Sequence, residues 1–85
     1  MTYRVIVEET AEKDLLRLPR EDFRRSGTRL RGLATDPRPP GCLKLMGSAN
    51  TWRIRAGKYR IVYDIDDENQ IVRVTRVRHR KNVYR

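Results

Sequence analysis

Arginines alternate with apolar residues in a segment that favours two β-strands joined by a tight turn. Arg53 and Arg55 are two residues apart, and Arg60 follows a short break. The pair Gly57-Lys58 at that break suits a two-residue hairpin turn with glycine first. Because side chains alternate between the two faces of a strand, we expect the three arginines on one open face. The residues that we expect to face the helices are Trp52, Ile54, Tyr59 and Ile61.

The chemistry of these arginines points to phosphate. A guanidinium group is planar and donates two parallel hydrogen bonds, a geometry that matches phosphate oxygens. The three side chains could therefore converge on one phosphate or on neighbouring ones. Each arginine taken singly could equally be a solvated residue that keeps a sheet edge soluble. As a set on one face, they indicate a binding site.

The C-terminal tail, residues 78–85, adds two further groups that could take part in catalysis. His79 is the only histidine, and imidazole gains and loses a proton near neutral pH, so it is a candidate for proton transfer. A surface histidine without a role is an equally good interpretation. Tyr84 could stack on a base or donate its hydroxyl, or it could pack on the sheet. The tail either lacks order in the free protein or folds back over the arginines.

The sequence lacks the signatures of several other enzyme classes. It contains no P-loop, dinucleotide-binding fingerprint or nucleophile elbow. No group of carboxylates and histidines suits a divalent metal ion, and the single Cys42 excludes an intramolecular disulfide and a cysteine-based zinc cluster. We therefore expect no metal and no cofactor. Cations with a histidine and a tyrosine suit RNA cleavage, in which the 2′-hydroxyl attacks the adjacent phosphate while the protein neutralises charge and moves two protons.

Charge is distributed unevenly along the chain. Twenty Lys and Arg against 11 Asp and Glu give a net charge of +9 at pH 7, and residues 71–85 contain six bases and no acid. A one-sided basic field of this kind favours a nucleic acid partner over a solubilising surface or an acidic protein partner. No apolar run reaches the roughly 20 residues of a membrane helix. The N-terminus lacks the apolar stretch of a signal peptide, so we expect a cytoplasmic location and no membrane partner.

Hydrophobic periodicity predicts helices in the first half of the chain. Residues 3–7 alternate like a strand. Apolar residues at helical spacing then predict helices over 11–18 and 23–34, with Thr10 as the N-cap of the first. Pro19 ends the first helix and can begin the second, because proline fits the first helical turn.

The second half is predicted to be mostly sheet. Three prolines interrupt residues 36–41 and predict a loop, which we expect to pack onto the domain through Leu43, Leu45 and Met46. Segments 52–56, 59–65 and 71–77 predict three strands that follow one another. The sequence therefore predicts an α+β fold in the order β-α-α-β-β-β, a small antiparallel sheet with two N-terminal helices packed on one face. Residues 1–85 suffice for one small core and are expected to form a single domain.

The chain resembles the RelE/ParE toxin superfamily, and within it the RelE-type messenger-RNA interferases. The resemblance rests on residues 11–19 (AEKDLLRLP), 52–65 (WRIRAGKYRIVYDI) and 77–85 (VRHRKNVYR). The three segments occur in the order and spacing of the family, so the resemblance covers nearly the whole chain. Residues 57–63 and the closing HRxxVYR are fairly specific in combination.

The resemblance implies roles for four residues. Arg60 matches the hairpin arginine that contacts the scissile phosphate in the family. Arg78 matches the tail arginine that stabilises the transition state. Tyr84 matches the tyrosine that orients the nucleotide, and His79 matches a histidine that transfers protons in some branches.

The chain departs from the family at two positions. Arg53 and Arg55 stand where well-studied members carry lysines, and arginine is a poor general base. If the reaction requires a base, His79 or Tyr84 takes that role. The residues that we expect to bind RNA are Lys44, Arg53, Arg55, Lys58, Arg80 and Lys81.

The resemblance also implies partners. Family members cleave mRNA in the ribosomal A site and pair with a small antitoxin, so we expect mRNA, the ribosome and an antitoxin with an acidic or amphipathic segment, in a hetero-oligomer. Three alternatives are compatible with the same residues: a ParE-like toxin that inhibits DNA gyrase, a non-catalytic basic module that binds RNA or the ribosome, and a decayed toxin that retains only its antitoxin partner.

Overall fold

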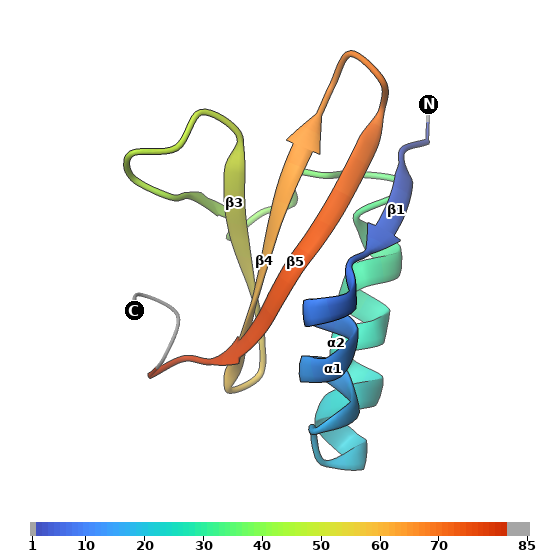
Figure 1. Ribbon diagram of the computed structural model, residues 1–85, viewed down its shortest axis with the longest axis vertical. Helices are drawn as coiled ribbons and strands as arrows, with labels where there is room; N and C mark the ends of the chain where they lie inside the picture. The colour runs from blue at the N-terminus through green and yellow to red at the C-terminus, as the bar shows by residue number, and fades with distance from the viewer. Residues whose placement is uncertain (1, 82–85) are drawn as a thin grey trace.

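The computed structural model describes residues 2–81, so Tyr84 lies outside the described residues. Within that range, two helices lie on one side of a five-stranded sheet (Figure 1), which confirms the predicted α+β class. The elements are β1 (Arg4–Val7), α1 (Glu9–Leu16), α2 (Arg20–Gly32), β2 (Leu43–Lys44), β3 (Thr51–Ala56), β4 (Tyr59–Asp66) and β5 (Ile71–His79).

The sheet has the strand order β1-β5-β4-β3-β2. The predicted succession β3-β4-β5 is antiparallel. Ala56 pairs with Tyr59 across the predicted two-residue turn, in which Gly57 has a positive φ of 63°.

The sheet as a whole is mixed rather than wholly antiparallel. β1 runs parallel to β5 at one edge, and the two-residue β2, which the sequence did not indicate, pairs antiparallel with β3 at the other. Alternation within residues 3–7 predicts a strand but says nothing about the direction of its partner. A parallel partner is possible here because the connection from β1 to β5 is long and contains both α1 and α2.

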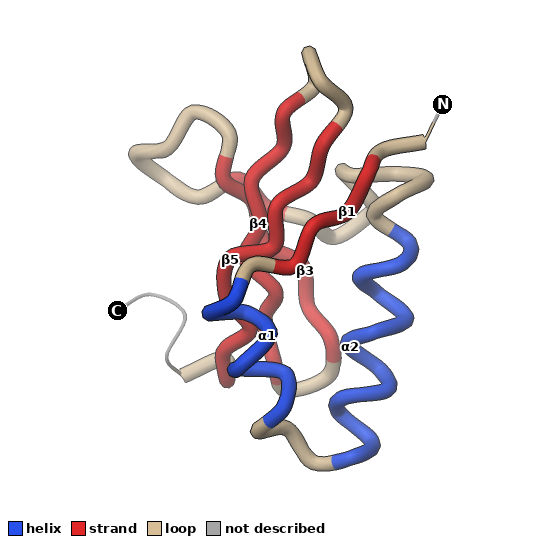
Figure 2. Tube along the Cα trace, turned by 45° about the vertical axis from the view of Figure 1, so that its right-hand side comes forward, coloured by secondary structure: helices blue, strands red, loops and turns tan. Residues whose placement is uncertain are grey.

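Helix α1 continues directly from β1 and lies beside β5 (Figure 2). Thr10 is not its N-cap as predicted, because Glu8 occupies that position. Instead, the Thr10 hydroxyl donates a hydrogen bond of 2.9 Å to the backbone carbonyl of Thr75, just beyond the last residue of β5 that pairs with β1. Pro19 separates the helices as predicted and is the N-cap of α2.

The core lies between the sheet and the helices. Ile54 and Ile61 are 1% and 0% exposed, which confirms the predicted inward face of β3 and β4, and Trp52 and Tyr59 pack partly buried against the same cluster. The helices contribute Ala11, Leu15, Leu30 and Leu33.

Strand β5 does not keep a strict alternation. Its buried residues are Val72, Val74 and Val77. The last two are three positions apart, because the pairing of β4 with β5 shifts by one residue between Val62 and Tyr63. This bulge reverses which residues of the C-terminal part of β5 face the helices.

The loop after α2 packs differently from the prediction. Of the three predicted residues only Leu45 is partly buried; Met46 is 99% exposed and Leu43 is 53% exposed, so these two side chains do not hold the loop on the domain. Cys42 packs against the core instead. The buried hydroxyl of Tyr63 donates a hydrogen bond of 2.8 Å to the carbonyl of Pro37, which ties the start of the loop to β4. Burial raises the pKa of the Tyr63 hydroxyl, so it stays a donor.

Candidate nucleic-acid interface

Three arginines form a row across the strands β3, β4 and β5. Arg55 pairs with Arg60, and Arg60 pairs with Arg78. Residues paired in this way point to the same face of a sheet. Their sequence neighbours Ile54, Ile61 and Val77 are buried toward the helices, so the row lies on the opposite, open face.

The bulge in β5 places Arg78 in this row. With an unbroken alternation from Val72 and Val74, residue 78 would point toward the helices. The extra residue between the pairs Val62–Arg76 and Tyr63–Val74 reverses the parity, so Val77 is buried and Arg78 faces outward. Arg53 lies two residues before Arg55 on β3 and shares the open face.

Arg60 occupies the centre of the row and is partly buried. Its Nε and Nη1 atoms are shielded from solvent and have no hydrogen-bond partner within the described part of the chain. Buried donors of a charged group without a partner are destabilising, since they lose water and gain nothing in return. A turn of the Arg60 guanidinium toward the open face would let an anion there supply the missing acceptors.

A pocket of about 370 Å³ opens beside Arg60 on the β3 side. No acidic residue is among the described residues that line it, which are Arg29, Pro40, Gly41, Leu43, Arg53, Arg55 and Arg60. The pocket therefore combines four guanidinium groups with backbone and apolar walls from the loop after α2. Its charge and donors suit a phosphate.

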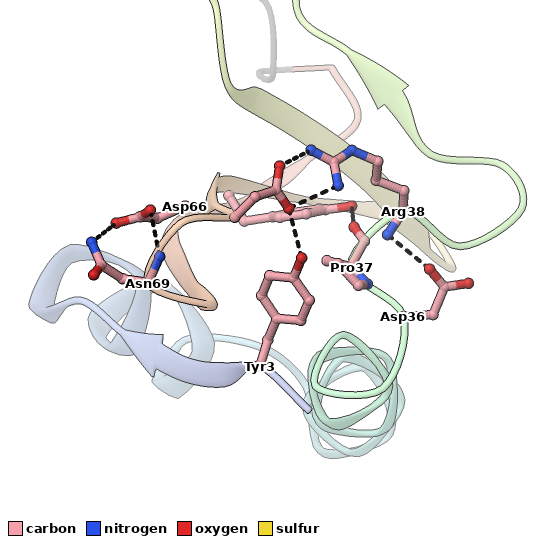
Figure 3. A network of polar contacts seen from close by, with 8 residues as sticks. Tyr3, Asp36, Pro37, Arg38, Asp66 and Asn69 are labelled. Carbon is pink, nitrogen blue, oxygen red and sulfur yellow. Dashed lines mark hydrogen bonds and ion pairs between the residues drawn. The ribbon is translucent and has the colours of Figure 1, made fainter. Parts of the chain in front are cut away.

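The loop that forms one wall of this pocket is held by a polar clamp. Asp67 accepts two hydrogen bonds from Arg38, at 2.8 and 3.2 Å, and one from the Tyr3 hydroxyl at 2.6 Å. Figure 3 shows Tyr3 and Arg38 approaching from different elements. The bonds from Arg38 and then from Tyr3 lower the pKa of Asp67 to about 2. The Arg38 guanidinium also lies 5.1 Å from the centre of the Trp52 ring.

Side chains from the two helices form hydrogen bonds to the backbone of β5 and of β3 at positions where, among the described residues, these strands have no neighbouring strand on one side. At the β5 edge, beyond the end of β1, Asp14 of α1 accepts hydrogen bonds from the Val77 amide at 2.9 Å and from Arg76 at 2.9 and 3.3 Å. At the β3 edge, Arg29 of α2 donates its Nε–H to the carbonyl of Arg55 at 3.1 Å. Neither Arg29 nor Arg38 was among the sequence candidates, because both act through contacts distant in sequence.

The other candidate residues lie outside this row. His79 pairs with Tyr59 and so shares the helix-side face, where the two rings meet edge to face at 5.5 Å. Its Nδ1 accepts a hydrogen bond of 3.3 Å from the Lys81 amide. His79 therefore lies on the opposite face of the sheet from Arg60 and Arg78.

The remaining residues that we expect to bind RNA lie in two different parts of the sheet. Lys58 lies in the β3–β4 turn, and its carbonyl accepts a hydrogen bond of 2.9 Å from the Arg80 amide. Lys58, Arg80 and Lys81 thus gather at the same end of the sheet as the arginine row. Lys44 is exposed on β2 and pairs with Trp52, which places it on the face opposite to Arg53.

A larger hollow of about 690 Å³ lies at the other end of β4 and is unsuited to phosphate. Its lining includes Asp64, Asp66, Asp67 and Glu68. Three of these acids bind other side chains of the protein: Asp64 binds Thr51, Asp66 binds Asn69, and Asp67 binds Arg38. Within residues 2–81, no group of three or more His, Cys, Asp or Glu could hold a metal ion. In the same range, neither helix has the length and apolar character needed to cross a membrane.

The chain is similar to toxins along almost its whole length. The family described as the ParE toxin of the type II toxin–antitoxin system, parDE, matches residues 5–84. Toxin RelG of Mycobacterium tuberculosis is 36% identical to this chain over 86 residues, an alignment that covers all of this chain and 99% of RelG.

Solved toxin structures share the fold. The archaeal RelE–RelB complex from Pyrococcus horikoshii OT3 has a TM-score of 0.84 at 27% identity and covers 98% of this chain and 100% of the other. The toxin–antitoxin complex RelBE2 from Mycobacterium tuberculosis has a TM-score of 0.83 at 33% identity and covers 94% and 100%. Together with the family match, these similarities show that the chain belongs to the RelE/ParE superfamily of toxins from type II toxin–antitoxin systems.

Proposed function

We propose that this toxin is a metal-independent endoribonuclease that cleaves messenger RNA in the ribosomal A site. The observation that carries the proposal is the arginine row across β3, β4 and β5, with Arg60 at its centre, two of whose buried donors have no partner among the described residues. The matching family is named for ParE, but the individual relatives and structures of at least 27% identity described above are named RelG or RelE, which favours the RelE branch over the gyrase-inhibiting ParE branch. The net charge of +9 suits a partner as negatively charged as RNA on the ribosome.

The reaction that fits these residues is attack of the RNA 2′-hydroxyl on the adjacent phosphorus. The bond from phosphorus to the 5′-oxygen breaks, which leaves a 2′,3′-cyclic phosphate and a 5′-hydroxyl. Negative charge on the phosphoryl oxygens rises in the transition state. Arg60 and Arg78 stand at one register on strands roughly 4.8 Å apart, so both can bind those oxygens. Since the Arg60 donors are already desolvated, their reorganisation cost on reaction is small.

Two protons must also move, one from the 2′-hydroxyl and one to the departing 5′-oxygen. We assign these transfers to His79 and Tyr84. The Nδ1 of His79 accepts a hydrogen bond from the Lys81 amide, which leaves Nε2 to face the RNA. To donate a proton to the 5′-oxygen, the ring must first be protonated at Nδ1 as well, which replaces that bond, and the imidazolium then gives up its Nε2 proton and returns to the neutral form. His79 is the last residue of β5, and this role requires the RNA to pass around that end of the sheet.

The first test is primer extension on a reporter mRNA with translating ribosomes present and absent. Wild type is compared with Arg60→Ala and with the control Arg73→Ala, which removes an exposed arginine near the acidic end of β5. We expect discrete, ribosome-dependent cleavage by wild type and Arg73→Ala, and none by Arg60→Ala. Cleavage without ribosomes would refute the A-site assignment. No cleavage by folded wild type would refute the nuclease, and a gyrase supercoiling assay would then test the ParE alternative.

We also propose a cognate antitoxin as partner, in a hetero-oligomer. The related structures from Pyrococcus horikoshii and Mycobacterium tuberculosis are toxin–antitoxin complexes. The open arginine face favours an acidic segment that folds as it binds. Titration with the small protein encoded beside the toxin should give a complex at micromolar concentration, and the absence of one would refute this partner.

A further inference from the structure

Helix α2 reaches the arginine face at the edge of β3. Strand β2 pairs only with Trp52 and Arg53, so the carbonyl of Arg55 lies beyond the end of this pairing. Arg29 donates its Nε–H to that carbonyl. The bond brings a guanidinium group from the helix layer to the sheet edge, where it forms a wall of the pocket beside Arg60.

Arg29 differs in this respect from its neighbours on α2. Arg24 and Arg25 approach the carboxylate of Glu21 at 3.1 and 3.9 Å, which offsets part of their charge. Among the described residues, no carboxylate lies within ion-pair distance of Arg29. Its charge adds to a pocket already lined by Arg53, Arg55 and Arg60, so the pocket should attract a further anion.

The pocket and Arg78 lie on different sides of Arg60. Arg78 belongs to β5 and is not among the residues that line the pocket, whereas Arg29 and Arg55 stand on the β3 side. Arg60, on β4, therefore adjoins two places for an anion. A single phosphate between Arg60 and Arg78 would leave the pocket on the β3 side for the next part of the ligand.

We propose that Arg29 binds a second phosphate of the RNA, next to the one held by Arg60 and Arg78. The RNA then crosses the open face from β5 to β3 and leaves over the β3 edge, past helix α2. This inference rests on the RNA-cleaving function proposed above and adds to it a contact and a direction for the strand.

The test is the salt dependence of RNA binding. A single-stranded oligonucleotide with 2′-O-methyl groups at every position cannot be cleaved, so binding is measured alone by fluorescence anisotropy over a series of NaCl concentrations. Each phosphate contact to single-stranded nucleic acid contributes about 0.7 to the slope of log K against log salt. We expect Arg29→Ala to reduce the slope by about 0.7, and Arg29→Lys, which keeps the charge, to retain it.

Arg31→Ala is the matched control, since it removes the same charge from the same helix. Arg31 is exposed and lines a different hollow, between α2 and β1, so the slope should not change. Melting curves establish that each variant is folded. Ribosome-dependent cleavage by the same variants is measured in parallel, and Arg29→Ala should lower it more than Arg29→Lys does.

The outcomes separate this inference from the proposed function. If Arg29→Ala binds with the wild-type slope, Arg29 does not contact phosphate. Arg29 also does not contact phosphate if both variants have an equally lowered melting temperature and equally reduced cleavage while the salt slope stays constant. Arg29 would then only stabilise the edge of β3. A reduced slope without cleavage by wild type would support the phosphate contact and refute the nuclease. Failure of wild type to bind the oligonucleotide would refute the phosphate contact, and ribosome-dependent cleavage by the same protein would still support the nuclease.

Discussion

Replacement of Asp14 tests how the end of β5, and with it Arg78, is held in position. The Asp14 side chain is nearly buried and accepts three hydrogen bonds, one from the Val77 amide and two from Arg76. β1 ends its pairing at Val74, so a helix side chain takes the place of a neighbouring strand at this edge. We expect Asp14→Ala to destabilise the fold and to reduce cleavage.

The loss of folding stability in Asp14→Ala can be estimated from the donors that would lose their acceptor. Val77 is 3% exposed, and its amide would lose its acceptor, which costs about 1–3 kcal/mol. The Arg76 side chain is 43% exposed, so solvent screening limits the ion pair to about 0–1 kcal/mol. Together the two losses amount to about 1–4 kcal/mol, and at about 4–8 °C per kcal/mol for a domain of this size Asp14→Ala should lower Tm by roughly 4–30 °C.

Thermal unfolding of three variants checks the reasoning. Asp14→Asn keeps an oxygen that can accept from the Val77 amide and should cost about 1 kcal/mol or less. Glu12→Ala, an exposed change on the same helix, should stay within about 0.5 kcal/mol of wild type. If Asp14→Ala were as stable as Glu12→Ala, the claim that α1 closes this edge would be wrong. If Asp14→Asn were as damaging as Asp14→Ala, the charge and not the acceptor would hold β5.

Three further predictions concern the site and its clamp. Arg60→Leu should abolish cleavage without lowering Tm, because it removes buried donors that have no partner in the described protein; a clear loss of stability in melting curves would contradict this. The pKa of Asp67 is lowered to about 2 by Arg38 and Tyr3, so the clamp should stabilise the fold fully above about pH 4, the ordinary range of the carboxyl. The stability difference between wild type and Asp67→Asn, from urea unfolding, should be constant above that pH and shrink as pH falls toward 2; a difference that grows on acidification would refute the assignment. His79→Ala should slow cleavage more than it weakens RNA binding, and equal losses in single-turnover and binding assays would remove it from proton transfer.

Local patterns were sufficient to predict the hairpin and most of the arginine face. Arg55 and Arg60 flank a two-residue turn, so their pairing follows from the turn length alone. Their apolar neighbours Ile54 and Ile61 identify the buried face by alternation. Both signals lie within about ten residues of sequence, where the period of the strand is dependable.

The position of Arg78 could not be read in the same way. Alternation from Val72 and Val74 assigns it to the buried face, and only the bulge in β5 turns it outward. Resemblance to a family was needed to single it out, because nothing in the local sequence marks the extra residue. The same bulge decides which of two neighbours faces outward: Arg78 lies on the open face and His79 on the helix side, whereas unbroken alternation would assign them the other way round.

The other features that the sequence did not predict depend on contacts between segments that are distant in sequence. Arg29 is 26 residues from Arg55, and Arg38 is 29 residues from Asp67. Before the strands are paired, each is one exposed arginine among many in a chain with 20 Lys and Arg. The parallel direction of β1 could not be predicted from the sequence either, since its partner β5 lies at the other end of the sequence.

Arg60 is unfavourable for folding stability for the same reason that it is favourable for binding an anion. Two of its donors have no partner among residues 2–81, which destabilises that part of the fold, while Asp14 and Arg29 hold the flanking strands β5 and β3. An acceptor that meets these donors once the side chain turns outward forms hydrogen bonds that the free protein lacks. A phosphate of RNA and a carboxylate of an acidic antitoxin segment would therefore compete for the same two atoms. An antitoxin of the proposed kind that bound there would raise the stability of the toxin and block its substrate through a single contact.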